Sequence, residues 1–159
     1  MRGLLLATGL ILATTATAQA EWSTEDGTDE AGRLFLAYST DADDVVEWQV
    51  LCDERAERRL EFLIFTGEPA ERKKALGRTL PLSLAIDGAT VTPLTAQLMV
   101  GKTELYFRVD EDAAGTLRQL VPAMAKADTM VMSYADTEWT FDGAGAKPAL
   151  AWVINSCTF

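Results

Sequence analysis

Two cysteines are the residues whose type and spacing point most directly to chemistry. Cys52 and Cys157 are the only cysteines among 159 residues, so a single intramolecular disulfide can form. It would enclose about a hundred residues, a loop for which chain entropy gives roughly 4.7 kcal/mol as an upper guide. Two reduced, buried thiols are the alternative. A redox or metal role is disfavoured because the pair lacks Cys-x-x-Cys spacing.

Histidine is absent from the chain, and this removes several kinds of catalytic site. Ser-His and Cys-His nucleophiles, histidine-ligated zinc and histidine acid–base chemistry all need an imidazole. Carboxylate pairs of the kind that hydrolyse glycosides stay open, because 24 acidic residues offer many combinations. We therefore predict no catalytic residues, no metal and no cofactor, and we keep a carboxylate-dependent hydrolase as the rival class.

Some acidic motifs resemble functional sites but fit ordinary turns better. Residues 110–115 resemble the start of a calcium-binding loop, yet Ala113 and Val121 stand where that loop needs oxygen ligands. Direct Asp-Gly steps, at residues 87–88 and 142–143, are hairpin-turn chemistry rather than an aspartic-protease dyad. We predict an acidic strand-to-helix turn at 110–115 and plain turns at the two Asp-Gly steps.

Basic residues are concentrated in two short segments of an otherwise acidic chain. They are Arg55, Arg58, Arg59, Arg72, Lys73 and Lys74. Interleaved glutamates make local ion pairing the simplest interpretation. If the two segments meet in space, they form a positive patch, which is then a candidate contact surface for a protein partner.

The overall charge and the N-terminal segment limit the environment and the partners. A net charge of −10 repels phosphate backbones and anionic lipid heads, so binding to nucleic acid or to membrane surfaces is disfavoured. Residues 1–20 have the pattern of a secretory signal peptide, with Arg2, an apolar run and a small-x-small site at 18–20. We predict a periplasmic or secreted protein with an unknown protein partner and no membrane insertion after signal cleavage.

Alternation of apolar and polar residues predicts β-strands for most of the mature chain. The clearest strand is 45–52, where Val46, Trp48, Val50 and Cys52 share one face. Residues 58–66 are apolar on both faces, which is typical of an inner strand buried on both sides. Other strands are expected at 33–40, 79–87, 90–100, 103–110, 129–134 and 137–141. Segment 67–77 is interpreted as a loop, with a short helix as the alternative.

Two segments favour helices, and together with the strands they define the fold class. Residues 111–127 have helical spacing of apolar residues, with a capping-box pattern at Thr116 and Gln119 and with Pro122 kinking the helix or opening a shorter one. For 148–156 a helix is favoured over a buried strand. We predict an α+β, mainly β fold: an antiparallel sheet or sandwich of about seven to eight strands with one or two helices in the C-terminal half. The predicted divisions are a signal peptide (1–20), a loose, polar N-terminal arm (21–32) and a single β-rich domain (33–159).

Several features together resemble the invasion-associated locus B family of exported proteobacterial proteins. They are the signal peptide, Trp48-x-Val50-x-Cys52, the run 80–88, the helical segment 117–127 before a strand, and the Ala-rich segment that ends at Cys157. The resemblance implies a small β-rich periplasmic domain with an envelope-associated role and no catalytic residues to carry over. We expect an exported, non-catalytic interaction or envelope domain. The alternatives are a carboxylate-dependent hydrolase and an inhibitor of an exported hydrolase.

Overall fold

A computed structural model describes residues 21–27, 29–56, 59–70, 77–89 and 91–157, and the predicted signal peptide lies outside them. In chain order the elements are β1 (Ser23–Asp26), β2 (Leu34–Thr40), β3 (Glu47–Asp53), a 3-10 helix η1 (Glu54–Ala56), β4 (Arg59–Pro69), β5 (Thr79–Ile86), β6 (Thr92–Val100), β7 (Glu104–Asp110), α1 (Thr116–Met124), β8 (Thr129–Tyr134), β9 (Thr137–Asp142) and α2 (Ala146–Ser156). The predicted fold class, mainly β with two helices, is confirmed.

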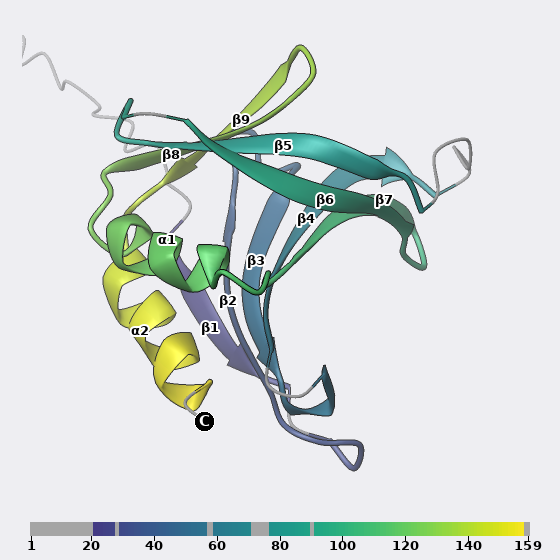
Figure 1. Cartoon of the computed structure of the whole chain (residues 1–159), viewed down its shortest axis with the longest axis vertical. Coiled ribbons are helices and arrows are strands. Elements are labelled where there is room, and N and C mark those ends of the chain that lie inside the picture. The colour runs from purple at the N-terminus through teal and green to yellow at the C-terminus, as the bar shows by residue number, and fades with distance from the viewer. Residues whose placement is uncertain (1–20, 28, 57–58, 71–76, 90, 158–159) are drawn as a thin grey trace, which may run out of the picture.

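The strands form one antiparallel sheet in the order β1-β2-β3-β4-β7-β6-β5-β8-β9. Figure 1 shows that this sheet curls strongly, so that β5 and β6 run steeply across the direction of β2 and β3. Its two edges meet at Trp22, just before β1. The backbone N–H of Trp22 donates to the carbonyl of Ala144, and its indole N–H donates to the carbonyl of Asp142, each at 2.9 Å. The curled sheet therefore surrounds the core with its inner face.

The predicted loose arm at 21–32 is wrong for Ser23–Asp26, which forms the edge strand β1 beside β2. All four side chains of β1 are exposed. Backbone hydrogen bonds to β2 hold the strand, and such bonds leave no apolar pattern in the sequence. With this strand, the sheet formed by the described residues has nine strands, against the seven or eight expected.

Trp48 lies at the centre of the core and confirms the predicted inner face of β3. It is fully buried, and the rings of Trp22, Phe62 and Phe141 pack edge-on around it with centroid distances of 5.2 to 5.4 Å. Its indole N–H has no hydrogen-bond acceptor among the described residues. Aromatic packing, which favours edge-to-face geometry, is therefore what holds this ring in place.

The predicted inner strand β4 lies between β3 and β7, and its two faces are buried unequally, which refines the prediction of burial on both faces for 58–66. Leu60, Phe62 and Ile64 are fully buried, whereas Leu63 and Phe65 are half-buried on the outer face. Buried residues of both helices belong to the core on the inner face. The outer face is therefore shielded mainly by side chains of neighbouring strands.

The sequence predicted both helices, but it predicted the N-terminal cap of α1 incorrectly. Helix α2 confirms the favoured interpretation of 148–156, with Leu150 and Val153 buried. In α1, the predicted capping box does not form, because Gly115 occupies the N-cap position and Thr116 bonds to Asp112 instead.

Acidic residues just before α1 accept hydrogen bonds from free backbone N–H groups in its first turn. The carboxylate of Glu111 accepts the N–H groups of Leu117 and Arg118, both at 3.1 Å. Carboxylates at a helix N-terminus are favoured because the free N–H groups point toward them. The predicted acidic strand-to-helix turn is confirmed.

The predicted disulfide is present and joins β3 to the residue that follows α2. The Cα atoms of Cys52 and Cys157 lie 5.7 Å apart. Since α2 packs against β1, β2 and β3, the bond fixes the last helix to the inner face of the sheet. Within the described residues, no helix has the length and apolar character needed to cross a membrane.

Candidate functional site

A cavity of about 220 Å³ opens at the end of the curled sheet away from the disulfide. We call it the mouth cavity. Five strands, β4, β6, β7, β8 and β9, supply its lining, which consists of Thr66, Glu68, Leu98, Leu105, Phe107, Tyr134, Thr137 and Trp139. It is thus built by segments far apart in the sequence and depends on the curl of the sheet.

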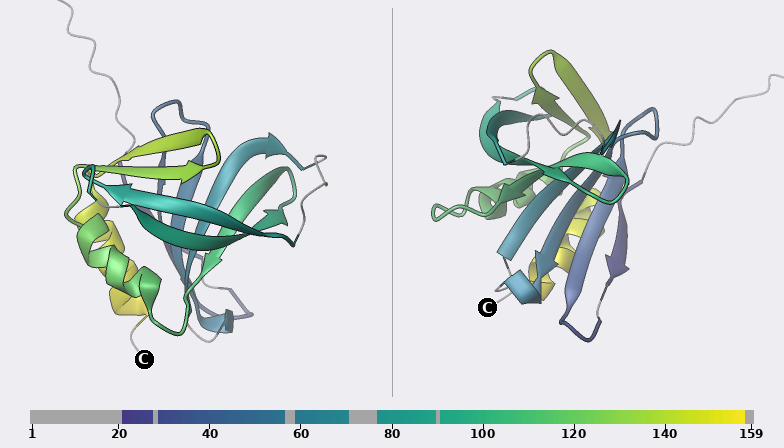
Figure 2. Two further views of the ribbon diagram at one scale, coloured as in Figure 1. Left: turned by 45° about the horizontal axis from the view of Figure 1, so that its top comes forward. Right: turned by 90° about the vertical axis from the view of Figure 1, so that its right-hand side faces the viewer.

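The β8–β9 hairpin forms one wall of the mouth cavity. Tyr134 and Thr137 are opposite each other in the register, so both point to the same face as Trp139. Ala135 makes the turn between the strands with a φ of 50°, a conformation that residues other than glycine seldom adopt. Figure 2 shows this hairpin at the margin of the sheet, next to β5.

Three aromatic rings give the cavity its chemical character. The Phe107 ring lies 4.9 Å from that of Tyr134 and 6.0 Å from that of Trp139, with planes inclined at 52° and 48°. Inclined rings of this kind form walls around a space rather than a flat stack. Together with Leu98 and Leu105, they make the apolar part of a partly enclosed site.

Polar groups of β4 lie beside the aromatic walls. The Thr66 hydroxyl donates to the carbonyl of Leu105 at 2.9 Å and accepts the backbone N–H of Glu68 at 3.2 Å. Glu68 is exposed, so its carboxylate brings negative charge to the rim. The arrangement can hold an apolar group and attract a positive one, and we take it as the candidate site.

A second hollow lies on the outer face of the sheet and is acidic. This groove has a volume of about 390 Å³, and its lining includes Asp44, Glu47 and Glu104 around Phe65. The Glu47 carboxylate accepts a hydrogen bond from the Gln49 amide, and the Glu104 carboxylate accepts the Gly67 N–H at 2.9 Å. Two of the three carboxylates thus have structural roles.

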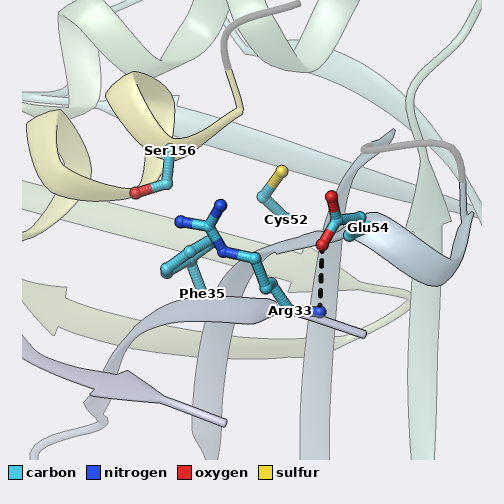
Figure 3. Close-up of a pocket in the computed structure, with 5 residues that line it drawn as sticks. All are labelled: Arg33, Phe35, Cys52, Glu54 and Ser156. Atoms are coloured by element: carbon cyan, nitrogen blue, oxygen red, sulfur yellow. Dashed lines mark hydrogen bonds between the residues drawn. The ribbon is translucent and has the colours of Figure 1, made fainter. Parts of the chain in front are cut away.

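The end of the fold beside the disulfide has little free space. Figure 3 shows Arg33, Phe35, Cys52, Glu54 and Ser156 around a hollow of about 10 Å³. That volume corresponds to at most about one water molecule. The Arg33 guanidinium lies over the Phe35 ring, 5.1 Å from its centroid, and the backbone N–H of Arg33 donates to Glu54. This hollow is therefore too small to hold a ligand larger than a water molecule.

Among the described residues, two carboxyl groups have a raised pKa, and they lie in different places. Burial raises the pKa of Glu61, while the Arg108 guanidinium, 3.0 Å from its carboxylate, opposes that effect. Burial also raises the pKa of Glu111, against the N–H groups of α1 that its carboxylate accepts. Neither residue is part of the mouth cavity or of the outer groove. The pair of facing acids that would favour a hydrolase is therefore not formed by these two groups.

The described acids show no grouping that would hold a metal ion, and the aspartates of the two Asp-Gly steps have backbone partners. Within the described parts of the chain, no three His, Cys, Asp or Glu residues are grouped to hold a metal ion. Asp87 accepts the N–H groups of Asp128 and Thr129, and Asp142 accepts that of Ala144. Both aspartates therefore act in turns, as their Asp-Gly steps predict.

The predicted basic patch is only partly within the described residues. Arg58, Arg72, Lys73 and Lys74 lie outside them. Arg55 bonds to Asp53 at 2.8 Å and to Asp29 at 3.3 Å, which fits local ion pairing. Arg59 is the first residue of β4, and Ala70 comes directly after the last residue of that strand. The described residues nearest to the two basic segments in sequence therefore lie at opposite ends of β4. The patch stays a prediction.

Sequence reasoning missed the residues of the mouth cavity. Trp139 and Tyr134 are recognisable as parts of strands, but their period-two pattern indicates only a buried face. What makes them a site is the approach of β8 and β9 to β7, which depends on long-range curling. Three comparisons, with protein-family models, curated proteins and solved structures, found no match for the chain.

Proposed function

We propose that this chain is an exported, non-catalytic binding domain, periplasmic or secreted, which holds an apolar group of a protein partner in its mouth cavity. The observation that carries the proposal is the cavity itself, where three aromatic rings and two leucines surround a partly enclosed space. Apolar pockets with a few polar groups are the usual form of a binding site. Aromatic anchors in such pockets also concentrate binding energy.

Export and an envelope role are supported from the sequence side. Residues 1–20 have the signal-peptide pattern, and a disulfide such as Cys52–Cys157 is compatible with an oxidising compartment. The resemblance to the invasion-associated locus B family points to the same setting. An inhibitor of an exported hydrolase is one form that such a binding domain can take.

The outer groove favours a second candidate function, a carboxylate-dependent hydrolase, because three carboxylates line it. Two of these accept hydrogen bonds within the protein, so their oxygens are already used in part. Binding in the mouth cavity is therefore better supported. Hydrolytic activity of the wild-type protein that is lost in both the Glu47→Gln and the Glu104→Gln variant would favour the hydrolase instead.

Site-specific photo-crosslinking in the exporting cell tests the binding function. A benzophenone amino acid replaces Thr137, which lines the mouth cavity, or Thr140, an exposed residue of the same strand that points to the other face. We expect a discrete protein adduct from position 137 and none from position 140. The same adducts from both positions, or none from either, would contradict the proposal.

A further inference from the structure

We propose that the group held in the mouth cavity is a cation with apolar substituents, of which a quaternary ammonium is the simplest example. This inference rests on the proposed binding function and names the chemistry of its ligand. Four properties of the cavity support it: the aromatic walls, the leucine side chains, the local charge and the volume.

The aromatic walls attract cations as well as apolar groups. A cation near the face of Trp, Tyr or Phe is stabilised by the quadrupole of the ring, and several inclined rings form the cages that bind quaternary ammonium groups. Phe107, Tyr134 and Trp139 form three such walls, with centroid distances of 4.9 and 6.0 Å from Phe107.

The leucine side chains favour a cation that carries no N–H donors. A primary ammonium carries three N–H donors that need acceptors. On one side of the mouth cavity, Leu98 and Leu105 offer no side-chain acceptor, and the Thr66 hydroxyl already donates to one backbone group and accepts from another. The remaining side-chain acceptors of the lining are the Glu68 carboxylate and the hydroxyls of Tyr134 and Thr137. A quaternary ammonium has no N–H donors, so it enters an apolar site without leaving hydrogen bonds unmade.

The charge and the volume of the mouth cavity also fit a compact cation. Among the described residues that line the cavity, Glu68 is negative and none is positive, and the chain as a whole has a net charge of −10. The volume of about 220 Å³ exceeds the roughly 150 Å³ of a cavity that holds benzene. It is smaller than the roughly 300–1,000 Å³ of sites for drug-sized ligands. The cavity thus suits one compact group.

Choline and its neutral isostere 3,3-dimethylbutan-1-ol provide the test, because they differ in charge and hardly in shape. Each is titrated into the ¹⁵N-labelled protein while the indole N–H signal of Trp139 is followed by NMR. The Trp152 signal serves as the internal control, since its ring packs on Phe35, which is no part of the mouth cavity. We expect choline to shift the Trp139 signal with an affinity at least about tenfold higher than that of the alcohol.

Two variants connect the binding to the cavity. Trp139→Leu is expected to abolish binding of both compounds. Glu68→Gln is expected to weaken choline several-fold and to leave the alcohol unchanged, because only the cation interacts with the carboxylate.

The outcomes separate this inference from the proposed function. Equal affinity for the two compounds would overturn the inference and leave an apolar binding site. A Trp139 signal that neither compound shifts would also overturn the inference. In either case, the photo-crosslinking experiment at position 137 tests the proposed binding function independently of the type of ligand.

Discussion

The rings of Trp22 and Trp48 meet edge-on, with their centroids 5.4 Å apart and their planes at 69°. Trp22 precedes the first strand, while Trp48 lies in β3 at the centre of the core. The indole N–H of Trp22 also bonds to the carbonyl of Asp142 at the end of β9. A single buried side chain therefore connects the two edges of the sheet to its interior.

Replacing Trp22 should loosen this closure. Trp22→Ala is expected to lower the free energy of unfolding by about 3–5 kcal/mol, because a buried indole is lost and a cavity remains. Trp22→Phe keeps an aromatic ring but loses the bond to Asp142, and about 1 kcal/mol is expected for that bond. Urea denaturation followed by circular dichroism measures both values. The exposed β1 variant Glu25→Gln serves as control and should stay within about 0.5 kcal/mol of wild type.

The disulfide should contribute strongly to stability, because it links residues 105 positions apart. The double variant Cys52→Ala, Cys157→Ala is expected to lose up to about 4.7 kcal/mol of unfolding free energy, the chain-entropy value for such a loop. It should still fold, since Leu150 and Val153 remain buried against the sheet. Denaturant titration measures the loss, and mass analysis after alkylation counts thiols. Two free thiols in the purified wild-type protein would contradict the pairing.

The sequence predicts the central strands well because one face of each is more deeply buried than the other. Trp48, Val50 and Cys52 share the inner face of β3, and the structure buries all three; apolar Leu51 alone interrupts the alternation, and it is buried on the other face. The disulfide was likewise predictable, since two cysteines allow a single pair. By contrast, β1 consists of four exposed residues, so the backbone bonds that hold it leave no trace in the pattern of side chains.

The mouth cavity could not be predicted for a different reason. Its walls come from β4, β6, β7 and the β8–β9 hairpin, so it depends on how far the sheet curls. Period-two patterns assign Phe107 and Trp139 to inner faces, but they do not say which inner residues meet, or where packing stops short of filling the space. That information lies in long-range contacts, for which single strands carry no local signal.

Glu61 should make stability depend on pH in a defined direction. Burial raises its pKa in the folded state, so the folded protein keeps the proton at pH values where the unfolded chain has lost it. The contribution of Glu61 to the free energy of unfolding is therefore fully present below the ordinary glutamate pKa of about 4.3. It is lost as the pH rises through the raised pKa of the folded state.

The Glu61→Gln variant removes this titration. Relative to wild type, its free energy of unfolding should improve as the pH rises from about 4 to about 7. Glu111 also has a raised pKa, but it is present in both proteins and cancels in the difference. Urea denaturation at several pH values gives that difference directly. A difference that stays constant, or that falls with pH, would argue against a buried glutamate with a raised pKa.

Gly143, between β9 and α2, should tolerate no side chain. A Cβ at this position would overlap the carbonyl group of Ala127, and backbone atoms cannot rotate away as a side chain does. Gly143→Ala is therefore expected to cost at least about 3 kcal/mol, the upper end of the range for overpacking. Gly88→Ala is the matched control. Gly88 has a φ of 67°, and a Cβ there would meet no atom within 4 Å beyond its chain neighbours, so only the backbone strain of about 1–2 kcal/mol applies. Thermal and urea unfolding of both variants compare the two costs, and equal losses would show that the chain around Ala127 can move aside.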